Sequence, residues 1–205
     1  MIERVVLATH NAKKLAELRR LAKASGGGFE VLGLEDVASY PEPAETEWTF
    51  EGNALLKARE CVHRTRLPAL ADDSGLEVDA FNGMPGVRSA RWAGAGASDA
   101  DNLDLLLRQL ADVPDVHRAA KFVCAMALVL PDGTEHVVRG EMPGRLGRDK
   151  RGGNGFGYDP AFIAEGQART NAELTPEAKD AISHRGKAVR AMVAHIVALN
   201  DGEAG

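Results

Sequence analysis

Four short segments of the sequence concentrate side chains that can bind a charged ligand or move a proton. The first follows an apolar stretch, opens a helical pattern and reads Thr9-His10-Asn11-Ala12-Lys13-Lys14. Free backbone N–H groups at a helix start, with a hydroxyl, an amide and two ammonium groups, form a cradle for an anion such as phosphate. Thr and Asn are also ordinary helix caps, and lysines often only meet solvent, so this segment alone leaves both interpretations open.

The second segment pairs two carboxylates, Asp72 and Asp73, at the end of a short apolar strand pattern. Adjacent side chains of a strand point to opposite faces, so at most one of them enters a given site while its neighbour serves another role. Carboxylates suit Mg²⁺, which prefers oxygen ligands, and residues 42–47 offer further acids. The alternative is an Asx-type turn at Ser74-Gly75 in which the carboxylates only accept local hydrogen bonds.

The third segment is the glycine-rich stretch GGNGFGYDP at residues 152–160. Its glycines let the backbone approach a ligand closely, and Phe156 and Tyr158 offer flat aromatic surface that suits a nucleobase. The competing interpretation is a flexible loop whose aromatic rings fold back onto the core.

The fourth segment places Lys179 ahead of Ser183-His184-Arg185-Gly186-Lys187. Arginine carries only hydrogen-bond donors, so in a pocket it favours a purine with a carbonyl acceptor at the 6-position over one with an amino group there. By itself the segment is equally typical of a helix break with a serine cap and solvated cations.

The surrounding patterns predict the elements that position these segments. Apolar residues at helical spacing predict helices over 12–24, 53–64, 102–110 and 189–196, with a further helix start at Thr175-Pro176. Thr49 is expected to cap the second helix, and Ser98 with Asp101 resembles a capping box. Strands are expected at 5–8, 29–32 and 69–73, followed by the turn at 74–75 and a second extended piece, and a hairpin at 121–130 and 136–139. We expect an exposed loop at 35–47 and an irregular glycine-rich segment at 83–98, and the glycine-rich stretch 140–157 is too long to be a mere connector.

Composition narrows the class of protein. The chain has 205 residues, 44% of them hydrophobic, which suits one α/β unit over 1–205 with a mixed sheet and a real core. The formal charge of −5 argues against a nucleic-acid partner, and the longest apolar run, residues 122–130, is too short to cross a membrane. With no signal-peptide pattern and with Cys61 and Cys124 far apart, we expect a cytoplasmic protein without disulfides.

Taken together, the segments resemble the inosine triphosphate pyrophosphatase family, which hydrolyses aberrant purine nucleoside triphosphates to the monophosphate and pyrophosphate. The resemblance rests on the order and spacing of LATHNAKKLAEL, TFEGNALLKAR, ALADDSGLEVDAFNGMPGVRSARWAG, GGNGFGYDPAF and ELTPEAKDAISHRGKAV, between residues 6 and 189. It implies an elongated mixed sheet flanked by helices in two lobes of a single domain, a central cleft, Mg²⁺ dependence and a homodimer.

The resemblance also implies roles for individual residues. On the phosphate side, Thr9, Asn11 and Lys14 match the triphosphate-binding turn, within a segment that also contains His10, Ala12 and Lys13, and Lys57 matches a lysine that approaches the phosphates. Asp73 matches the acid that activates water, with Asp72 beside it and Ser74 touching substrate. Glu45 matches the metal-binding glutamate, with Glu42 as the alternative, so the implied metal ligands are Glu45, Asp72 and Asp73. The implied nucleobase pocket consists of Phe156, Gly157, Tyr158, Asp159, Lys179, His184 and Arg185.

Two other functions remain open from the sequence. One is a pyrophosphatase for other modified nucleotides, against which ADDSG and SHRGKA argue. The other is a catalytically silent nucleotide-binding protein, which needs the anion cradle and the base pocket but not the acids Glu45, Asp72 and Asp73.

Overall fold

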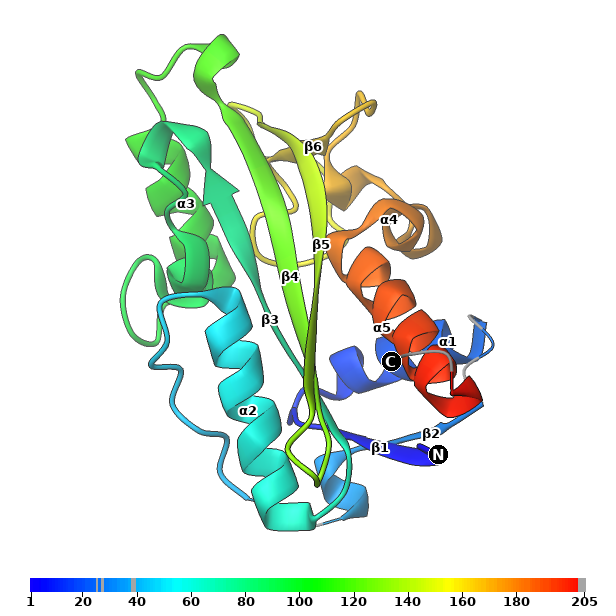
Figure 1. The fold of residues 1–205 in the computed structure, drawn as a ribbon. Helices are drawn as coiled ribbons and strands as arrows, with labels where there is room; N and C mark the ends of the chain where they lie inside the picture. Colours follow the sequence, from blue (N-terminus) through cyan, green and yellow to red (C-terminus); the bar gives the residue numbers. More distant parts are fainter. Residues whose placement is uncertain (25, 27, 38–39, 203–205) are drawn as a thin grey trace. The chain divides into compact units, whose positions relative to one another are not determined.

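The computed structural model describes residues 1–202 apart from 25, 27, 38 and 39, and its chain forms a mixed α/β fold (Figure 1). Within these residues six strands make one sheet in the order β2-β1-β3-β4-β5-β6. Strand β1 pairs in parallel with β2 and β3, and β5 pairs antiparallel with β6, so the sheet is mixed as predicted. The strands are β1 Arg4–Leu7, β2 Glu30–Leu32, β3 Ala69–Val78, β4 Ala119–Val129, β5 Glu135–Leu146 and β6 Phe162–Ala164. The α-helices are α1 Ala12–Ala24, α2 Phe50–Thr65, α3 Asp99–Gln109, α4 Pro176–Ile182 and α5 His184–Asp201.

The chain divides into two compact units. Unit 1 comprises Met1–Asp73, Cys124–Arg139 and Gly186–Gly205, and unit 2 comprises Ser74–Val123 and Gly140–Arg185. None of the described helices is both long and apolar enough for a membrane span.

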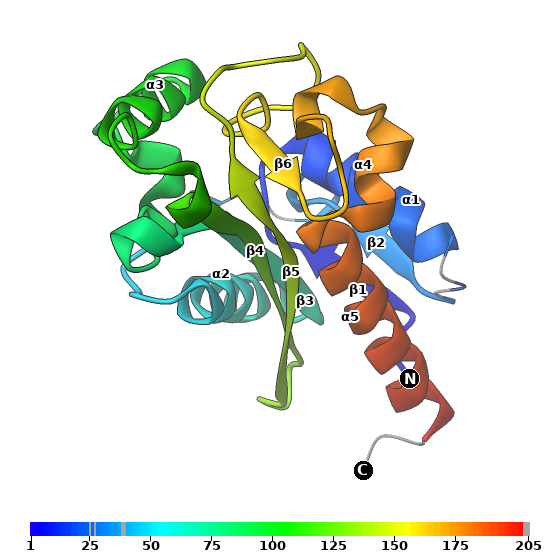
Figure 2. The same ribbon diagram turned by 90° about the horizontal axis from the view of Figure 1, so that it is seen from above.

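In unit 1, helices α1 and α5 lie on one side of the strands and α2 lies on the other (Figures 1 and 2). The apolar stripe of α1, formed by Leu15, Leu18 and Leu21, packs in one core cluster with Val5, Leu7 and Leu70 of the strands. The predicted apolar stripe of α5 enters the same cluster and is almost fully buried; it consists of Val189, Met192, Val193 and Ile196. Successive side chains of a strand point to opposite faces of the sheet. Because Leu70 of β3 faces α1 and α5, the side chains on either side of it in the strand, Ala69 and Ala71, face α2.

In unit 2, a second core cluster gathers leucines of α3, strand residues and one aromatic side chain of the glycine-rich segment. Leu103, Leu106 and Leu110 are all almost fully buried there, together with Phe162 and Tyr158. Local signals position the helices as predicted: Ser98 and Asp101 form the capping box of α3. Thr175 caps α4 with proline at the first helical position.

Two strand predictions were wrong. Residues 74–75 form no turn, because β3 runs without a break from Ala69 to Val78, and Asp72 and Asp73 lie inside this strand rather than at its tip. Strand β5 continues to Leu146, well beyond the predicted hairpin strand 136–139, so the first part of the glycine-rich stretch 140–157 is extended and paired. In both places the hydrogen bonds of neighbouring strands outweigh the local turn preference of Gly, Ser and Pro.

Candidate active site

The Thr9–Lys14 segment is a compact turn between β1 and α1. The Asn11 backbone N–H donates to the Thr9 hydroxyl at 3.2 Å, and the Asn11 side-chain oxygen accepts from the Lys14 N–H at 3.2 Å. The turn is therefore held by its own polar side chains, as the sequence predicted for a capped helix start. Ala12 is exposed at the start of α1, and the side chain of Lys13 lies outside what the structure describes.

His10, at the apex of this turn, reaches a distant segment. Its Nε2 lies 2.9 Å from the Tyr40 carbonyl oxygen, so Nε2 carries the proton and donates it. Tyr40 itself is buried, which corrects the prediction that the whole stretch 35–47 is exposed. Ala38 and Ser39 of that stretch lie outside the described residues.

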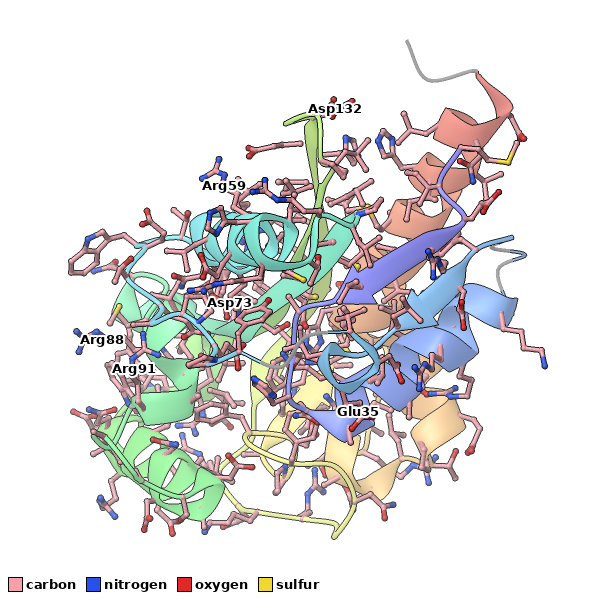
Figure 3. The ribbon with its side chains drawn as sticks, turned by 90° about the horizontal axis from the view of Figure 1, so that it is seen from below. Glu35, Arg59, Asp73, Arg88, Arg91 and Asp132 are labelled. Atoms are coloured by element: carbon pink, nitrogen blue, oxygen red, sulfur yellow. The ribbon has the colours of Figure 1, made fainter. Side chains whose placement is uncertain are left out.

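The adjacent carboxylates Asp72 and Asp73 face different helices, as strand geometry requires. Asp72 accepts a hydrogen bond from the Lys14 ammonium of α1 at 2.9 Å. Asp73 accepts one from the side-chain amide of Asn53, on α2, at 2.9 Å, and Figure 3 shows Asp73 beside that helix. Both carboxylates are more than nine-tenths buried. One dipeptide thus supplies one acid to each side of unit 1.

Lys57 of α2 links Asp73 to the loop that precedes this helix. Its Nζ lies 3.1 Å from Glu45 Oε1 and 3.9 Å from Asp73 Oδ1, and only 4% of the lysine side chain is exposed. Burial alone would lower the pKa of Lys57, but the surrounding carboxylates, with Asp73 first, hold this pKa above its ordinary value. The lysine is therefore a fixed cation between two carboxylates.

The environment of Asp73 tunes its proton affinity. Desolvation raises the pKa of Asp73 to about 6, against the opposing effect of the Lys57 ammonium and the Asn53 amide. At neutral pH this carboxylate is mostly ionised and is a much better proton acceptor than an exposed aspartate. A pKa near the working pH is what general base catalysis needs.

The predicted metal ligands are only partly gathered. Among the residues that the structure describes, no group of three or more His, Cys, Asp or Glu side chains is arranged to hold a metal ion. Glu45 and Asp73 share Lys57 as a neighbour, whereas Asp72 contacts Lys14 on the other side of β3. Glu42, the alternative to Glu45, is exposed. Glu45 and Asp73 are oxygen donors of the kind that a hard divalent cation takes.

Charge counting supports a role for such a cation. The acid-lysine cluster, as we call it, comprises Lys14, Glu45, Lys57, Asp72 and Asp73. Its two ammonium groups and three carboxylates sum to 2 − 3 = −1 when ionised. A polyphosphate brought to this cluster needs additional positive charge.

In unit 2 the two aromatic residues of the glycine-rich segment have different roles. Phe156 is 59% exposed, and the Lys179 ammonium lies 5.0 Å from the centre of its ring. Tyr158, by contrast, is buried in the second core cluster, and its hydroxyl donates to the Ser89 carbonyl oxygen at 2.7 Å. The prediction that both rings offer surface to a base therefore holds only for Phe156, because burial of Tyr158 anchors the loop.

The buried side chain of Asp159 holds the same glycine-rich segment through hydrogen bonds. Its carboxylate accepts from the Phe156 backbone N–H at 2.9 Å, from the Asn171 amide at 3.1 Å and from the Lys179 ammonium. A side chain at Gly155 would collide with this carboxylate, and the positive φ of 76° there also favours glycine. Asp159 thus positions Phe156 and Lys179 through its side chain.

The remaining predicted residues are placed as follows. Gly157 donates its N–H to Asp99 at 3.0 Å. His184 and Arg185 begin α5 and are buried, with the His184 ring stacked on Phe122 at a centroid distance of 5.0 Å. Ser74 follows Asp73 in β3 and is half-buried. Unit 2 thus brings together Phe156, Asp159 and Lys179.

One residue of the site escaped the sequence analysis. Asn53 is fully buried, and it contacts Asp73 directly. A signal was available, since Asn53 precedes Lys57 by four positions and therefore lies on the same face of a helix. A single asparagine in a helical pattern is more often a surface residue, so this spacing alone was not decisive.

Comparison with known proteins identifies the family of this chain. The sequence model described as Ham1 family matches residues 5–195. A dITP/XTP pyrophosphatase of Cutibacterium acnes is 57% identical over 203 residues, covering 98% of this chain and 100% of the relative. One of Nocardia farcinica is 58% identical over 199 residues, covering 97% of each.

Solved structures give the same result. The crystal structure of a nucleoside-triphosphatase, dITP/XTP pyrophosphatase, from Mycobacterium abscessus has a TM-score of 0.79 at 54% identity, covering 92% of this chain and 98% of that one. A HAM1 protein from Coxiella burnetii has a TM-score of 0.88 at 40% identity, covering 96% and 99%. Because the family match spans most of the sequence and these relatives align over nearly their whole length, this chain belongs to the Ham1 family.

Proposed function

We propose that this chain hydrolyses noncanonical purine nucleoside triphosphates, namely ITP, dITP and XTP, to the nucleoside monophosphate and pyrophosphate, and so removes them from the nucleotide pool. Relatives that are 52–58% identical over at least nine-tenths of the chain bear the name dITP/XTP pyrophosphatase, which supports this substrate class. The observation that carries the reaction is the buried Asp73, whose raised pKa and contacts with Asn53 and Lys57 suit a general base.

In this proposal Asp73 accepts a proton from a water molecule as the water oxygen attacks the α-phosphorus. The bond from that phosphorus to the α–β bridging oxygen breaks, and pyrophosphate leaves with the electron pair. Lys57 and Lys14 offset the charge of the phosphates, while the backbone and side chains of the Thr9–Lys14 turn orient them. The protein contributes mainly position and charge, as in other phosphoryl displacements.

A divalent cation, Mg²⁺, completes the proposed site. Glu45 and one carboxylate of the Asp72-Asp73 pair would hold it, and the −1 sum of the acid-lysine cluster is the reason that a cation is needed. When bound, Mg²⁺ supplies charge neutralisation at the phosphates and the leaving pyrophosphate. Asp72 also orients Lys14, which lies on the other side of β3 from Lys57.

On the base side we propose that Phe156 stacks on the purine and that the donors of Lys179 and Arg185 select a carbonyl at the 6-position. Asp159 keeps Phe156 and Lys179 in place. We further propose a cytoplasmic homodimer, on the strength of the family resemblance.

The test is a panel of ITP, dITP, XTP, GTP, ATP and dUTP, each with and without Mg²⁺, with separate assays for pyrophosphate and orthophosphate. Pyrophosphate from the first three substrates in the presence of Mg²⁺ is expected. Orthophosphate as the product would refute attack at the α-phosphorus, and equal cleavage of ATP and ITP would refute the donor-based selection. Tight binding of ITP without turnover would establish the silent nucleotide-binding alternative.

A further inference from the structure

Asn53 is the most completely buried polar residue that touches the acid-lysine cluster, with 0% exposure on the second turn of α2. Its side-chain oxygen accepts from the Glu47 backbone N–H at 3.0 Å, and its side-chain nitrogen donates to Asp73 Oδ2 at 2.9 Å. Both ends of the amide are therefore used, one by the loop that carries Glu45 and the other by the proposed base.

Chemistry fixes which way this amide points. A backbone N–H can only donate, so the atom that faces Glu47 must be the oxygen Oδ1. The nitrogen Nδ2 then faces the Asp73 carboxylate, which can only accept when ionised. A flipped amide would set two donors against each other at one end and two acceptors at the other, so burial enforces a single orientation.

The loop end is also packed tightly against this part of α2. A Cβ atom added at Gly52 would lie 2.7 Å from the Glu47 Cβ, so the helix accepts the loop there only because residue 52 is glycine. The Asn53 bond to Glu47 and the Lys57 contact with Glu45 hold the same short loop at two points.

We propose that Asn53 is the positioning residue of the proposed active site: its amide holds the Asp73 carboxylate and the Glu45 loop in one fixed arrangement. This proposal rests on the proposed function. Asn53 commits Oδ2 of Asp73 to the helix, so that Oδ1, the oxygen on the Lys57 side, is presented toward the attacking water. The same amide sets where Glu45 stands relative to Asp73.

The test compares Asn53→Asp with a matched control, Asn102→Asp. Asn102 of α3 is also buried, at 2% exposure, and also bridges two groups: its oxygen accepts from the Ala93 N–H at 2.7 Å and its nitrogen donates to the Ala90 carbonyl at 3.2 Å. Both substitutions keep the acceptor and remove the donor. Only in Asn53→Asp does the lost donor serve Asp73, so the two variants separate catalysis from folding.

We expect Tm to fall in both variants, and kcat for ITP to fall at least about 10-fold only in Asn53→Asp. The affinity for a nonhydrolysable ITP analogue, measured by calorimetry, is expected to change less than about 3-fold, because the Asn53 side chain contacts Glu47 and Asp73 rather than the Thr9–Lys14 turn. In Asn53→Asp the loss therefore falls on kcat rather than on KM, whereas in Asn102→Asp both stay near the wild-type values.

An Asn53→Asp variant whose kcat and KM match those of Asn102→Asp refutes the positioning role while leaving the proposed function intact. Wild-type protein that releases no pyrophosphate from ITP refutes the proposed function itself. If Asn53→Asp does not fold, the exchange variant Asn53→Asp/Asp73→Asn decides. The exchange restores a hydrogen bond of reversed polarity, so recovered folding without turnover supports the contact, and an unfolded exchange variant overturns it.

Discussion

Replacing Lys57 with Met tests how the site sets the proton affinity of its proposed base. The Lys57 ammonium lies 3.9 Å from Asp73 Oδ1, and both side chains are more than nine-tenths buried. At this distance and an effective dielectric constant of about 20, two unit charges interact by about 4 kcal/mol. Removal of the ammonium therefore raises the pKa of Asp73, and the acid limb of kcat/KM moves upward by as much as roughly 3 pH units.

The assay is pyrophosphate release from ITP at saturating Mg²⁺ between pH 5 and pH 9, over the range where both variants stay folded. In the wild type we expect activity to be lost as pH falls through about 6, because the base must be ionised. The control is Lys14→Met, which also removes a cation but one that contacts Asp72 at 2.9 Å; its KM rises and its acid limb stays near that of the wild type. A Lys57→Met enzyme with an unmoved acid limb refutes the assignment of the Asp73 pKa to this lysine.

Three further substitutions probe base chemistry, base stacking and the fold. Asp73→Asn is expected to lower kcat by about 10²- to 10⁴-fold with Tm nearly unchanged, and retained turnover would remove Asp73 from the base role. Phe156→Ala removes an exposed ring and is expected to raise KM for ITP about 10-fold without lowering Tm; an unchanged KM would show that the base stacks elsewhere. Arg118→Met removes the hydrogen-bond donors of three carbonyl oxygens, those of Leu110, Leu146 and Gly147, and is expected to lower the free energy of unfolding by about 3 kcal/mol in urea titrations. A loss below about 1 kcal/mol would show that these carbonyls find other donors.

The helices were predictable because their signals are local. Thr49 caps α2 by accepting from the Gly52 N–H, and Ser98 with Asp101 caps α3, each within four residues of chain. The apolar stripe of α1 likewise matches its buried face, since Leu15, Leu18 and Leu21 meet the strands. Such features need no knowledge of distant neighbours.

The strands were predicted less well because their ends depend on hydrogen bonds to strands that are distant in the sequence. Ser74-Gly75 is typical of a turn, yet it lies inside β3, which has β1 and β4 as neighbours. Gly144 looks like a strand breaker, but a Cβ there would lie 2.3 Å from the Ile163 carbonyl oxygen of β6. Glycine at that position permits the close approach of two strands rather than ending one.

In the candidate site, too, local features were predictable from the sequence and long-range contacts were not. The opposite orientation of Asp72 and Asp73 followed from strand geometry alone, and the structure confirms it through their different partners. The buried state of Tyr158 and the bridging role of Asn53 depend on contacts with segments that sequence spacing does not reveal. Burial distinguishes a polar residue that positions others from one that only meets solvent.

The pairing of β3 with β1 has a consequence for how insertions and deletions act on this protein. Register here fixes Val6 opposite Ala69 and Leu7 opposite Leu70. Loss of Ala71, the residue between Leu70 and Asp72, would shift the following residues by one position and turn their side chains to the opposite face. Asp73 would then take the place of Asp72, Ser74 would take the place of Asp73 beside Asn53, and Asp72 would enter the buried position of Ala71. The proposed active site and the core packing would both be disrupted. Insertions and deletions in this chain are therefore expected to be tolerated in its loops and not in β3.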